Sequence, residues 1–215
     1  MPPPGHDLAS RRLYLCTGDR PDLERFVEAC IAGGVDVVQL REKHLEARPL
    51  LERAARLLRV CRGLGVPFIL NDRPDLALEV GADGVHVGQG DAPPALCRRI
   101  LGPAAIVGLS THAPPEWDAA AAEADYLSAG PVSATPTKPG RAGTGLGYLR
   151  HAASSAETRP WFVTGGATPD TVAAMAEAGA RRFVAVRWLT EASDPRQATR
   201  QLRDAIERSV ESLLS

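Results

Sequence analysis

The 215-residue sequence has few aromatic residues and no long hydrophobic run, and its charges nearly balance. Aromatic residues make up 5% of the chain, and the formal net charge is −1. A nearly neutral chain lacks the excess positive charge that binding to nucleic acid or an anionic membrane requires. No apolar run approaches the roughly 20 residues of a membrane-spanning helix. We therefore expect neither nucleic acid nor a membrane as a partner.

Cysteine is scarce as well, and the four cysteines show no metal-binding or redox spacing. They form no CxxC pair and no cluster with histidine, which argues against a zinc site. We expect Cys16, Cys30, Cys61 and Cys97 to be reduced thiols. The N-terminus lacks the basic and apolar segments of a secretory signal. We expect a cytoplasmic protein, with residues 1–10 as a disordered tail.

What the sequence does contain is a regular alternation of short β-rich runs and amphipathic stretches, the pattern of βαβ units. Candidate strands are 12–17, 35–40, 67–70, 84–87, 106–110, 126–129, 161–164 and 182–186. Candidate helices are 21–32, 47–64, 74–80, 93–101, 115–122, 145–154, 169–178 and 195–214. Eight units without a long linker favour an α/β fold, a single-domain (β/α)8 TIM barrel over 11–215; an open doubly wound sheet is the alternative. In such barrels the functional loops follow the strands.

Three polar residues alternate at the end of the second candidate strand: Gln39, Arg41 and Lys43. Alternate residues of an extended chain point the same way, so an amide, a guanidinium and an ammonium converge. This trio suits a diphosphate, since Arg binds two oxygens and Lys adds a mobile charge. A solvated strand end is the simpler alternative.

Two carboxylates follow the next two strands, Asp72 after the third and Asp91 after the fourth. Beside a diphosphate they predict a Mg2+ site, because Mg2+ takes few protein oxygens and completes its shell with phosphate and water. Alternatively, each aspartate caps the helix that follows it. His86 lies near the end of the fourth candidate strand, where it either lines the pocket or is hydrogen-bonded as part of the structure.

The longest loop, 130–145, follows the sixth candidate strand and contains Thr135, Thr137 and Lys138. Loops of this length in a compact domain are usually functional or mobile, and these side chains can donate to phosphate oxygens. Lysine and asparagine are rare in this chain, with two and one copies. All three fall on the expected catalytic face: Lys43, Lys138 and Asn71.

A glycine pair, Gly165 and Gly166, follows the seventh candidate strand and precedes a candidate helix. Backbone amides of such glycines at a helix N-terminus can cradle a phosphate. Barrels often build phosphate sites from the loops after strands seven and eight, so the position of the pair strengthens this prediction.

Together these segments resemble the thiamine-phosphate synthase family, in order and spacing, from about Tyr14 to Pro195. The segments are Leu13-Tyr14-Leu15, Gln39-x-Arg41-x-Lys43, Asn71-Asp72, His86-x-Gly88-Gln89-x-Asp91, Gly108-Leu109-Ser110-Thr111-His112, Thr135-x-Thr137-Lys138 and Gly165-Gly166. The resemblance implies a transferase that moves an aminopyrimidine methyl group from its diphosphate ester to the nitrogen of a thiazole phosphate. The products would be thiamine phosphate and pyrophosphate, formed by a dissociative, Mg2+-assisted substitution.

The resemblance also implies roles for individual residues. Those holding the diphosphate would be Gln39, Arg41, Lys43, Asn71 and Lys138, with Mg2+ on Asp72 and Asp91. Those holding the thiazole phosphate would be Thr135, Thr137, Gly166 and the backbone around Val186 and Arg187. Ser110 would sit near the reacting pyrimidine, and Tyr14 and His86 would be further substrate-binding residues. The catalytic residues would be Lys138, Ser110 and Arg41.

Trp188 is bulkier than a family member is expected to carry, and Arg187 either contacts phosphate or forms an outward salt bridge. The nearest alternatives on the same fold are a thiazole tautomerase and a non-catalytic, thiamine-precursor-binding regulatory relative. The tautomerase carries a histidine in the loop after strand six, where this chain has Pro131 and no histidine. A phosphosugar isomerase or aldolase is a more distant alternative. The sequence leaves open whether the protein forms a homo-oligomer.

Overall fold

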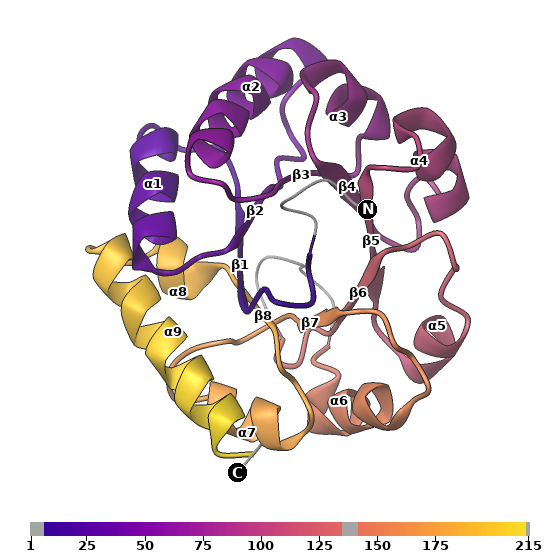
Figure 1. Cartoon of the computed structure of the whole chain (residues 1–215), viewed down its shortest axis with the longest axis vertical. Helices are drawn as coiled ribbons and strands as arrows, with labels where there is room; N and C mark the ends of the chain where they lie inside the picture. Colours follow the sequence, from indigo (N-terminus) through magenta and orange to yellow (C-terminus); the bar gives the residue numbers. More distant parts are fainter. Residues whose placement is uncertain (1–6, 135–141, 214–215) are drawn as a thin grey trace.

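The computed structural model describes residues 7–134 and 142–213. Eight parallel strands pair in chain order, and β8 pairs with β1, which closes a barrel (Figure 1). The strands are β1 (Leu13–Thr17), β2 (Val37–Leu40), β3 (Phe68–Asn71), β4 (Gly84–Val87), β5 (Ile106–Thr111), β6 (Tyr126–Ala129), β7 (Trp161–Val163) and β8 (Phe183–Ala185). The predicted TIM barrel is confirmed, and each predicted strand boundary lies within two residues of the observed one.

Helices surround the barrel, one after each strand and an extra one after β8. They are α1 (Leu23–Gly33), α2 (Ala47–Gly63), α3 (Pro74–Val80), α4 (Pro94–Leu101), α5 (Pro114–Asp118), α6 (Gly145–Ser154), α7 (Val172–Glu177), α8 (Arg187–Thr190) and α9 (Pro195–Glu211). Within the described residues, no helix combines the length and the apolar character needed to cross a lipid bilayer.

Two helix predictions were wrong in their bounds, and one helix was missed. The helix predicted at 115–122 already ends at Asp118. The helix predicted at 169–178 begins only at Val172, because the Thr171 hydroxyl closes a turn ahead of it. That hydroxyl accepts from the Thr168 amide at 2.9 Å and donates to the Gly166 carbonyl at 2.6 Å. The short helix α8 was not predicted at all, since a four-residue helix leaves no periodic pattern.

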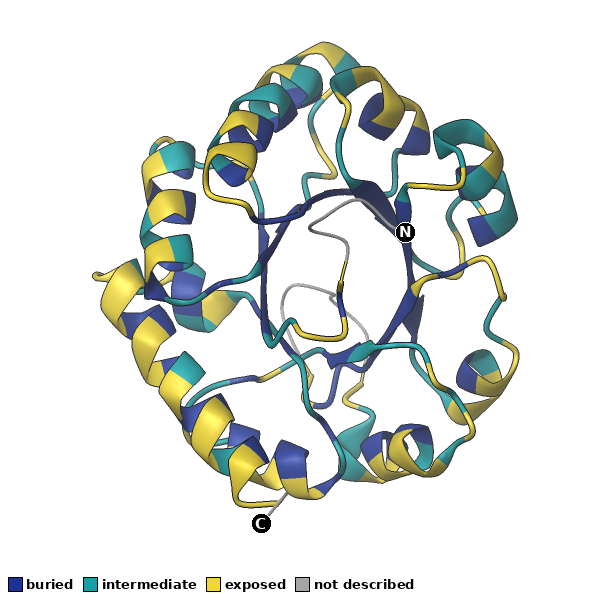
Figure 2. Cartoon of the chain, viewed as in Figure 1, coloured by how far each residue is buried: buried dark blue, intermediate teal, exposed yellow. Residues whose placement is uncertain are grey.

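The strands are buried on both faces, as the dark ring in Figure 2 shows. Outside the ring, aliphatic side chains of the strands pack against the inner sides of the helices in one large core. Inside it, a smaller cluster fills the barrel: Leu8, Tyr14, Val37, Ile69, Ile106, Tyr126 and Phe162. Leu8 belongs to the segment that we expected to be a disordered tail, yet it is buried in this cluster, so the packed domain begins before residue 11.

All four cysteines lie in the described part of the chain, are buried and form no disulfide. Burial raises the pKa of the Cys30 thiol to about 11 and that of Cys61 to about 12. These two thiols are therefore protonated at neutral pH and serve as small apolar core residues.

Candidate active site

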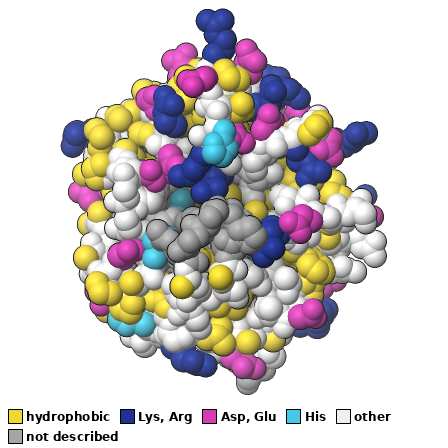
Figure 3. Space-filling view, turned by 180° about the vertical axis from the view of Figure 1, so that it is seen from behind, with side chains coloured by type: hydrophobic (Ala, Val, Ile, Leu, Met, Phe, Trp, Pro, Cys, Tyr) yellow, Lys and Arg dark blue, Asp and Glu magenta, His cyan; other side chains and the backbone are white. Residues whose placement is uncertain are grey.

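A pocket opens inside the barrel at the carboxyl ends of the strands. Every predicted site residue within the described part of the chain lines it: Tyr14, Gln39, Arg41, Lys43, Asn71, Asp72, His86, Asp91, Ser110, Gly166, Val186 and Arg187. Thr135, Thr137 and Lys138 lie outside the described residues. Figure 3 shows the face opposite to that of Figure 1, where Lys and Arg side chains gather near the centre.

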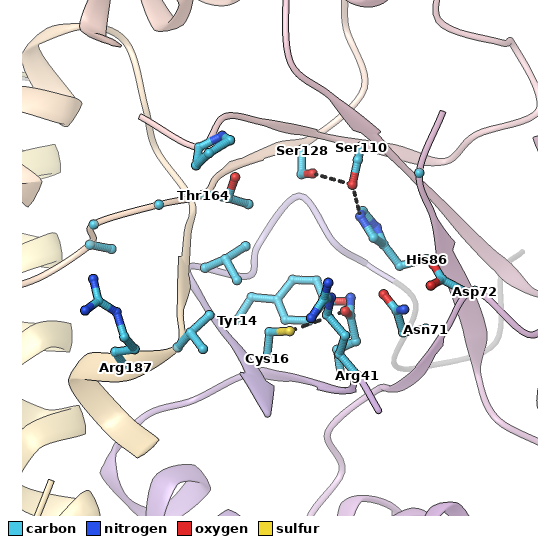
Figure 4. A pocket seen from close by; sticks show the side chains of 18 of the residues that line it. Tyr14, Cys16, Arg41, Asn71, Asp72, His86, Ser110, Ser128, Thr164 and Arg187 are labelled. Atoms are coloured by element: carbon cyan, nitrogen blue, oxygen red, sulfur yellow. Dashed lines mark hydrogen bonds between the residues drawn. The ribbon is translucent and has the colours of Figure 1, made fainter. Parts of the chain in front are cut away.

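The alternating residues at the end of β2 share one face, as predicted, but they lie at different depths. Arg41 directs its guanidinium into the pocket (Figure 4), and the Lys43 ammonium reaches the pocket rim with 45% of its side chain exposed. Gln39 lies deeper and is buried, and its amide bonds within the barrel wall. Gln39 Nε2 donates to the Tyr14 hydroxyl at 2.8 Å, and Oε1 accepts from Cys16 Sγ at 3.4 Å.

Asp72 and Asp91 are brought together at the pocket, and neither caps a helix. Helices α3 and α4 start without any side-chain cap. The Asp72 backbone has φ 63, a left-handed conformation that is rare outside glycine and that recurs at functional sites. The Asp72 carboxylate lies 2.7 Å from the Lys43 ammonium, and Asp91 Oδ2 accepts from the Gly88 amide at 2.8 Å.

The electrostatics of this pair favour a cation. Burial raises the pKa of the Asp72 carboxyl, and the neighbouring Asp91 raises it further, while Lys43 opposes the shift. Like charges this close disfavour ionisation of both groups. Among the described residues no set of three His, Cys, Asp or Glu side chains is grouped for a metal, so the pair alone is the candidate. Two carboxylates are sufficient for Mg2+, which keeps water and phosphate oxygens in its shell.

Asn71 adds to this part of the pocket a buried donor that no described residue satisfies. Asn71 is the last residue of β3, and only 7% of its surface is exposed. Its side chain lines the pocket next to Asp72. Its Nδ2 is buried and has no hydrogen-bond partner among the described residues. An unmet buried donor costs about 1–3 kcal/mol, and an acceptor bound in the pocket would remove this cost.

Hydrogen-bonded side chains line the interior below these groups. His86 Nε2 lies 2.8 Å from Ser110 Oγ, and His86 Nδ1 lies 2.9 Å from the Tyr126 hydroxyl. His86 thus both lines the pocket and forms part of its structure. Sequence reasoning missed Tyr126 and Ser128, although they alternate along β6 as Gln39 and Arg41 do at the end of β2, a signal that could have identified them.

The opposite side of the pocket is formed after β7 and β8. Gly165 and Gly166 both have positive φ, 85 and 94, and a Cβ on Gly165 would lie 2.4 Å from Pro131 Cβ. The expected helix N-terminus does not follow them directly, because α7 starts at Val172. Instead α8 begins beside the pocket with Arg187 as its first residue.

Arg187 and Trp188 differ in how they are held. Figure 4 shows Arg187 across the pocket from Asn71 and Asp72. Its side chain is exposed and makes no ion pair within the described residues, which argues against the outward salt bridge. Trp188 lines the pocket, and its Nε1 donates to the Ala198 carbonyl at 2.9 Å, which ties the indole to α9.

Comparison with known proteins accords with this geometry. Residues 13–189 match the family model described as thiamine monophosphate synthase. Thiamine-phosphate synthase from Thermus thermophilus is 50% identical over 202 residues, which cover 91% of this chain and 97% of that one. The enzyme of the same name from Mycobacterium tuberculosis is 47% identical over 213 residues, covering 93% and 96%.

A solved structure agrees as well. Thiamine phosphate pyrophosphorylase from Pyrococcus furiosus superposes with a TM-score of 0.83 at 30% identity, covering 93% of this chain and 96% of that one. These matches extend over nearly the whole chain and include every strand of the barrel. The expected resemblance is confirmed, as is the expectation of an enzyme: the chain belongs to the thiamine monophosphate synthase family.

Proposed function

We propose that this enzyme couples an aminopyrimidine methyl diphosphate with a hydroxyethylthiazole phosphate and releases thiamine phosphate and pyrophosphate. The observation that carries the proposal is the unbonded, buried Asn71 amide beside the Asp72–Asp91 pair. A diphosphate with a bound cation would satisfy both at once, because its oxygens accept from the amide and its metal neutralises the carboxylates. The relatives named thiamine-phosphate synthase support the same reaction.

The diphosphate would lie between Arg41, Lys43 and Asn71, all of which line one side of the pocket. Arg41 offers a planar fork for two oxygens, and the half-exposed Lys43 can follow the departing group. Lys138, predicted to share this role, lies outside the described residues. Gln39 is held by Tyr14 and Cys16, so only its second amide hydrogen is left for a ligand.

Asp72 and Asp91 would hold Mg2+, and the fit rests on their close approach and on the raised pKa of the Asp72 carboxyl. The ion would supply charge neutralisation to the leaving diphosphate. The chain's own contribution is electrostatic and geometric. Arg41 and Lys43 would stabilise negative charge as the bond to the diphosphate lengthens. The barrel walls would exclude water from the cationic methylene carbon attached to the electron-rich aminopyrimidine ring.

The thiazole phosphate would lie on the opposite side, near Gly166, Val186 and Arg187. Two anionic groups at opposite ends of one pocket place the reacting carbon and nitrogen between them. Positioning of this kind replaces an encounter in solution by a near-attack geometry, which is a large part of catalysis in substitutions without a protein nucleophile.

The test is release of pyrophosphate and thiamine phosphate from both substrates, with Mg2+ present and after chelation. Equimolar products that require the metal are expected, and Asp91→Asn should raise the Mg2+ concentration needed for half-maximal rate by about 10–100-fold. Tight binding of both substrates without any product would instead favour the regulatory relative. Full activity after exhaustive chelation would contradict the Mg2+ assignment but leave the reaction standing.

A further inference from the structure

A continuous series of hydrogen-bonded side chains crosses the barrel interior along the wall of the pocket. Ser110 Oγ lies 2.8 Å from His86 Nε2, and His86 Nδ1 lies 2.9 Å from the Tyr126 hydroxyl. The Tyr126 hydroxyl lies 2.9 Å from that of Tyr14, which accepts from Gln39 Nε2 at 2.8 Å. Figure 4 shows the pocket end of this series, where Ser128 and His86 converge on Ser110.

The number of available protons determines which group donates in each of these hydrogen bonds. The amide nitrogen of Gln39 can only donate, so the Tyr14 oxygen accepts from it. If Tyr14 then donates to Tyr126, the Tyr126 proton goes to His86 Nδ1 and each phenolic proton has an acceptor. In the reverse direction Tyr14 accepts from both neighbours, and its own proton has no acceptor within these hydrogen bonds. Tyr14 is 1% exposed, so the reverse order leaves a buried donor unmet.

The phenols act as neutral hydroxyls throughout. Burial raises the pKa of both Tyr14 and Tyr126 well above the ordinary value for tyrosine. The His86 and Tyr126 rings also stack, with centroids 5.3 Å apart and an interplanar angle of 29°, which fixes the imidazole plane. The imidazole therefore has a set orientation, and its neighbours decide which nitrogen carries the proton.

The direction determines what Ser110 offers to a substrate. With Nδ1 as acceptor, neutral His86 carries its proton on Nε2 and donates it to Ser110 Oγ. Ser128 Oγ also donates to Ser110 Oγ, at 3.5 Å. With its oxygen accepting from both, the Ser110 hydroxyl directs its own proton into the pocket. His86 is thus not a base for Ser110, and the serine is a hydrogen-bond donor and not a nucleophile.

We propose that Tyr126 is a positioning residue, which holds His86 as the Nε2–H tautomer and so presents the Ser110 hydroxyl as a donor to an acceptor nitrogen of the heteroaromatic substrate. The proposal rests on the proposed function in one respect, that the pocket binds a nitrogen heteroaromatic ring. The tautomer itself is a property of the free enzyme and can be tested without substrate.

The first test is nitrogen-15 NMR of the histidine-labelled free enzyme, with the His86 signals identified by their loss in His86→Gln. We expect a pyridine-type shift for Nδ1 and a pyrrole-type shift for Nε2. In Tyr126→Phe the two shifts should move toward each other as the tautomers mix. The opposite tautomer in the wild type would overturn the proposal whatever the enzyme's activity.

Tyr148→Phe is the matched control, because it also removes a buried tyrosine hydroxyl from this barrel. Tyr148 is 5% exposed, and its hydroxyl donates to Thr111 Oγ1 at 2.6 Å, without lining the pocket. This variant should lower the thermal midpoint of unfolding, as Tyr126→Phe should, but leave the His86 shifts and the kinetics unchanged.

The second test is a double-mutant cycle on the reaction. Tyr126→Phe should raise the KM of the pyrimidine diphosphate on the order of tenfold, the effect of losing one hydrogen bond, with a smaller change in kcat. If Tyr126 acts through Ser110, adding Tyr126→Phe to Ser110→Ala should raise KM no further. If the two substitutions raised KM independently, so that their effects multiplied in the double variant, the proposal would be overturned. Absence of turnover in the wild type would count against the proposed function, while the tautomer would still be decided by NMR.

Discussion

The ammonium of Lys43 lies 2.7 Å from the carboxylate of Asp72, so a cation predicted to hold substrate is paired with a carboxylate predicted to hold metal. In the absence of ligands this pair partly offsets the repulsion between Asp72 and Asp91. If a diphosphate and a cation bind as proposed, Lys43 would turn to the phosphate and Asp72 to the metal. The ion pair thus holds the two side chains against each other at the pocket.

Replacing Lys43 with methionine should lower kcat/KM by about 100- to 1000-fold, the cost of removing one electrostatic contact to a developing charge. Because Lys43 lowers the pKa of the Asp72 carboxyl, its loss should also move the acid limb of the pH–rate profile to higher pH. Steady-state rates across pH check both effects. Lys43→Arg keeps the charge, so an acid limb displaced equally in that variant would contradict the explanation.

The raised pKa of the Asp72 carboxyl predicts a gain in stability from Asp72→Asn in the metal-free enzyme. A group whose pKa is higher in the folded state binds its proton more tightly there, so stability falls as pH rises from the unfolded pKa through the folded one. The neutral amide of the variant removes this penalty at neutral pH. At a pH below the range in which carboxylates titrate, the substitution should change stability little.

Urea unfolding at neutral and at acidic pH measures the effect of Asp72→Asn, with EDTA present. The variant should be more stable than the wild type only at neutral pH. Added Mg2+ should stabilise the wild type and not the variant, because only the wild type keeps both carboxylates. A variant less stable than the wild type at neutral pH would show that the Lys43 ion pair outweighs burial and Asp91.

The barrel and most of the site were predictable from the sequence because both follow from the same repeat. Each β-rich run ends at the same rim, so residues just after a run, such as Asn71 and Asp72, must meet at the pocket. The alternation of Gln39, Arg41 and Lys43 likewise predicted their common face, since side chains alternate along an extended chain.

The features that could not be predicted depend on contacts between distant segments. The depth of Gln39 is set by Tyr14 and Cys16 on the neighbouring strand β1, and no local pattern encodes such a partner. The hydrogen bond between Tyr126 and His86 joins residues 40 positions apart in the chain. The helix α8 is too short for periodicity to indicate, although it brings Arg187 to the pocket.

Arg187 should contribute to binding of the thiazole phosphate and not to binding of the diphosphate. It is exposed, makes no ion pair among the described residues and lies across the pocket from Asp72. Arg187→Ala should raise the KM of the thiazole phosphate about tenfold at low salt, with a smaller effect at high salt, where exposed charges are screened. Kinetics with each substrate varied in turn measure this. An equal rise in both KM values would place Arg187 outside the thiazole-phosphate site.

The close approach of Gly165 to Pro131 predicts that the wall of the pocket tolerates no side chain at this position. A Cβ on Gly165 would lie 2.4 Å from Pro131 Cβ and 2.7 Å from Pro131 Cα, at a backbone φ of +85. Gly165→Ala therefore combines a left-handed backbone conformation with a clash against the backbone at Pro131. To relieve the clash, the residues that follow β7 and the segment at Pro131 must move apart.

Gly65→Ala separates the two causes, because Gly65 also has positive φ, +68, but a Cβ there would meet nothing within 4 Å. The control should lose about 1–2 kcal/mol of unfolding free energy, the cost of a left-handed alanine. Gly165→Ala should lose more than this and should also raise the KM of the thiazole phosphate, since Gly165 and Pro131 both line the pocket. Urea unfolding and steady-state kinetics of the two variants decide the matter. Equal losses of stability with an unchanged KM would mean that the segment at Pro131 moves aside freely and that the close approach does not shape the site.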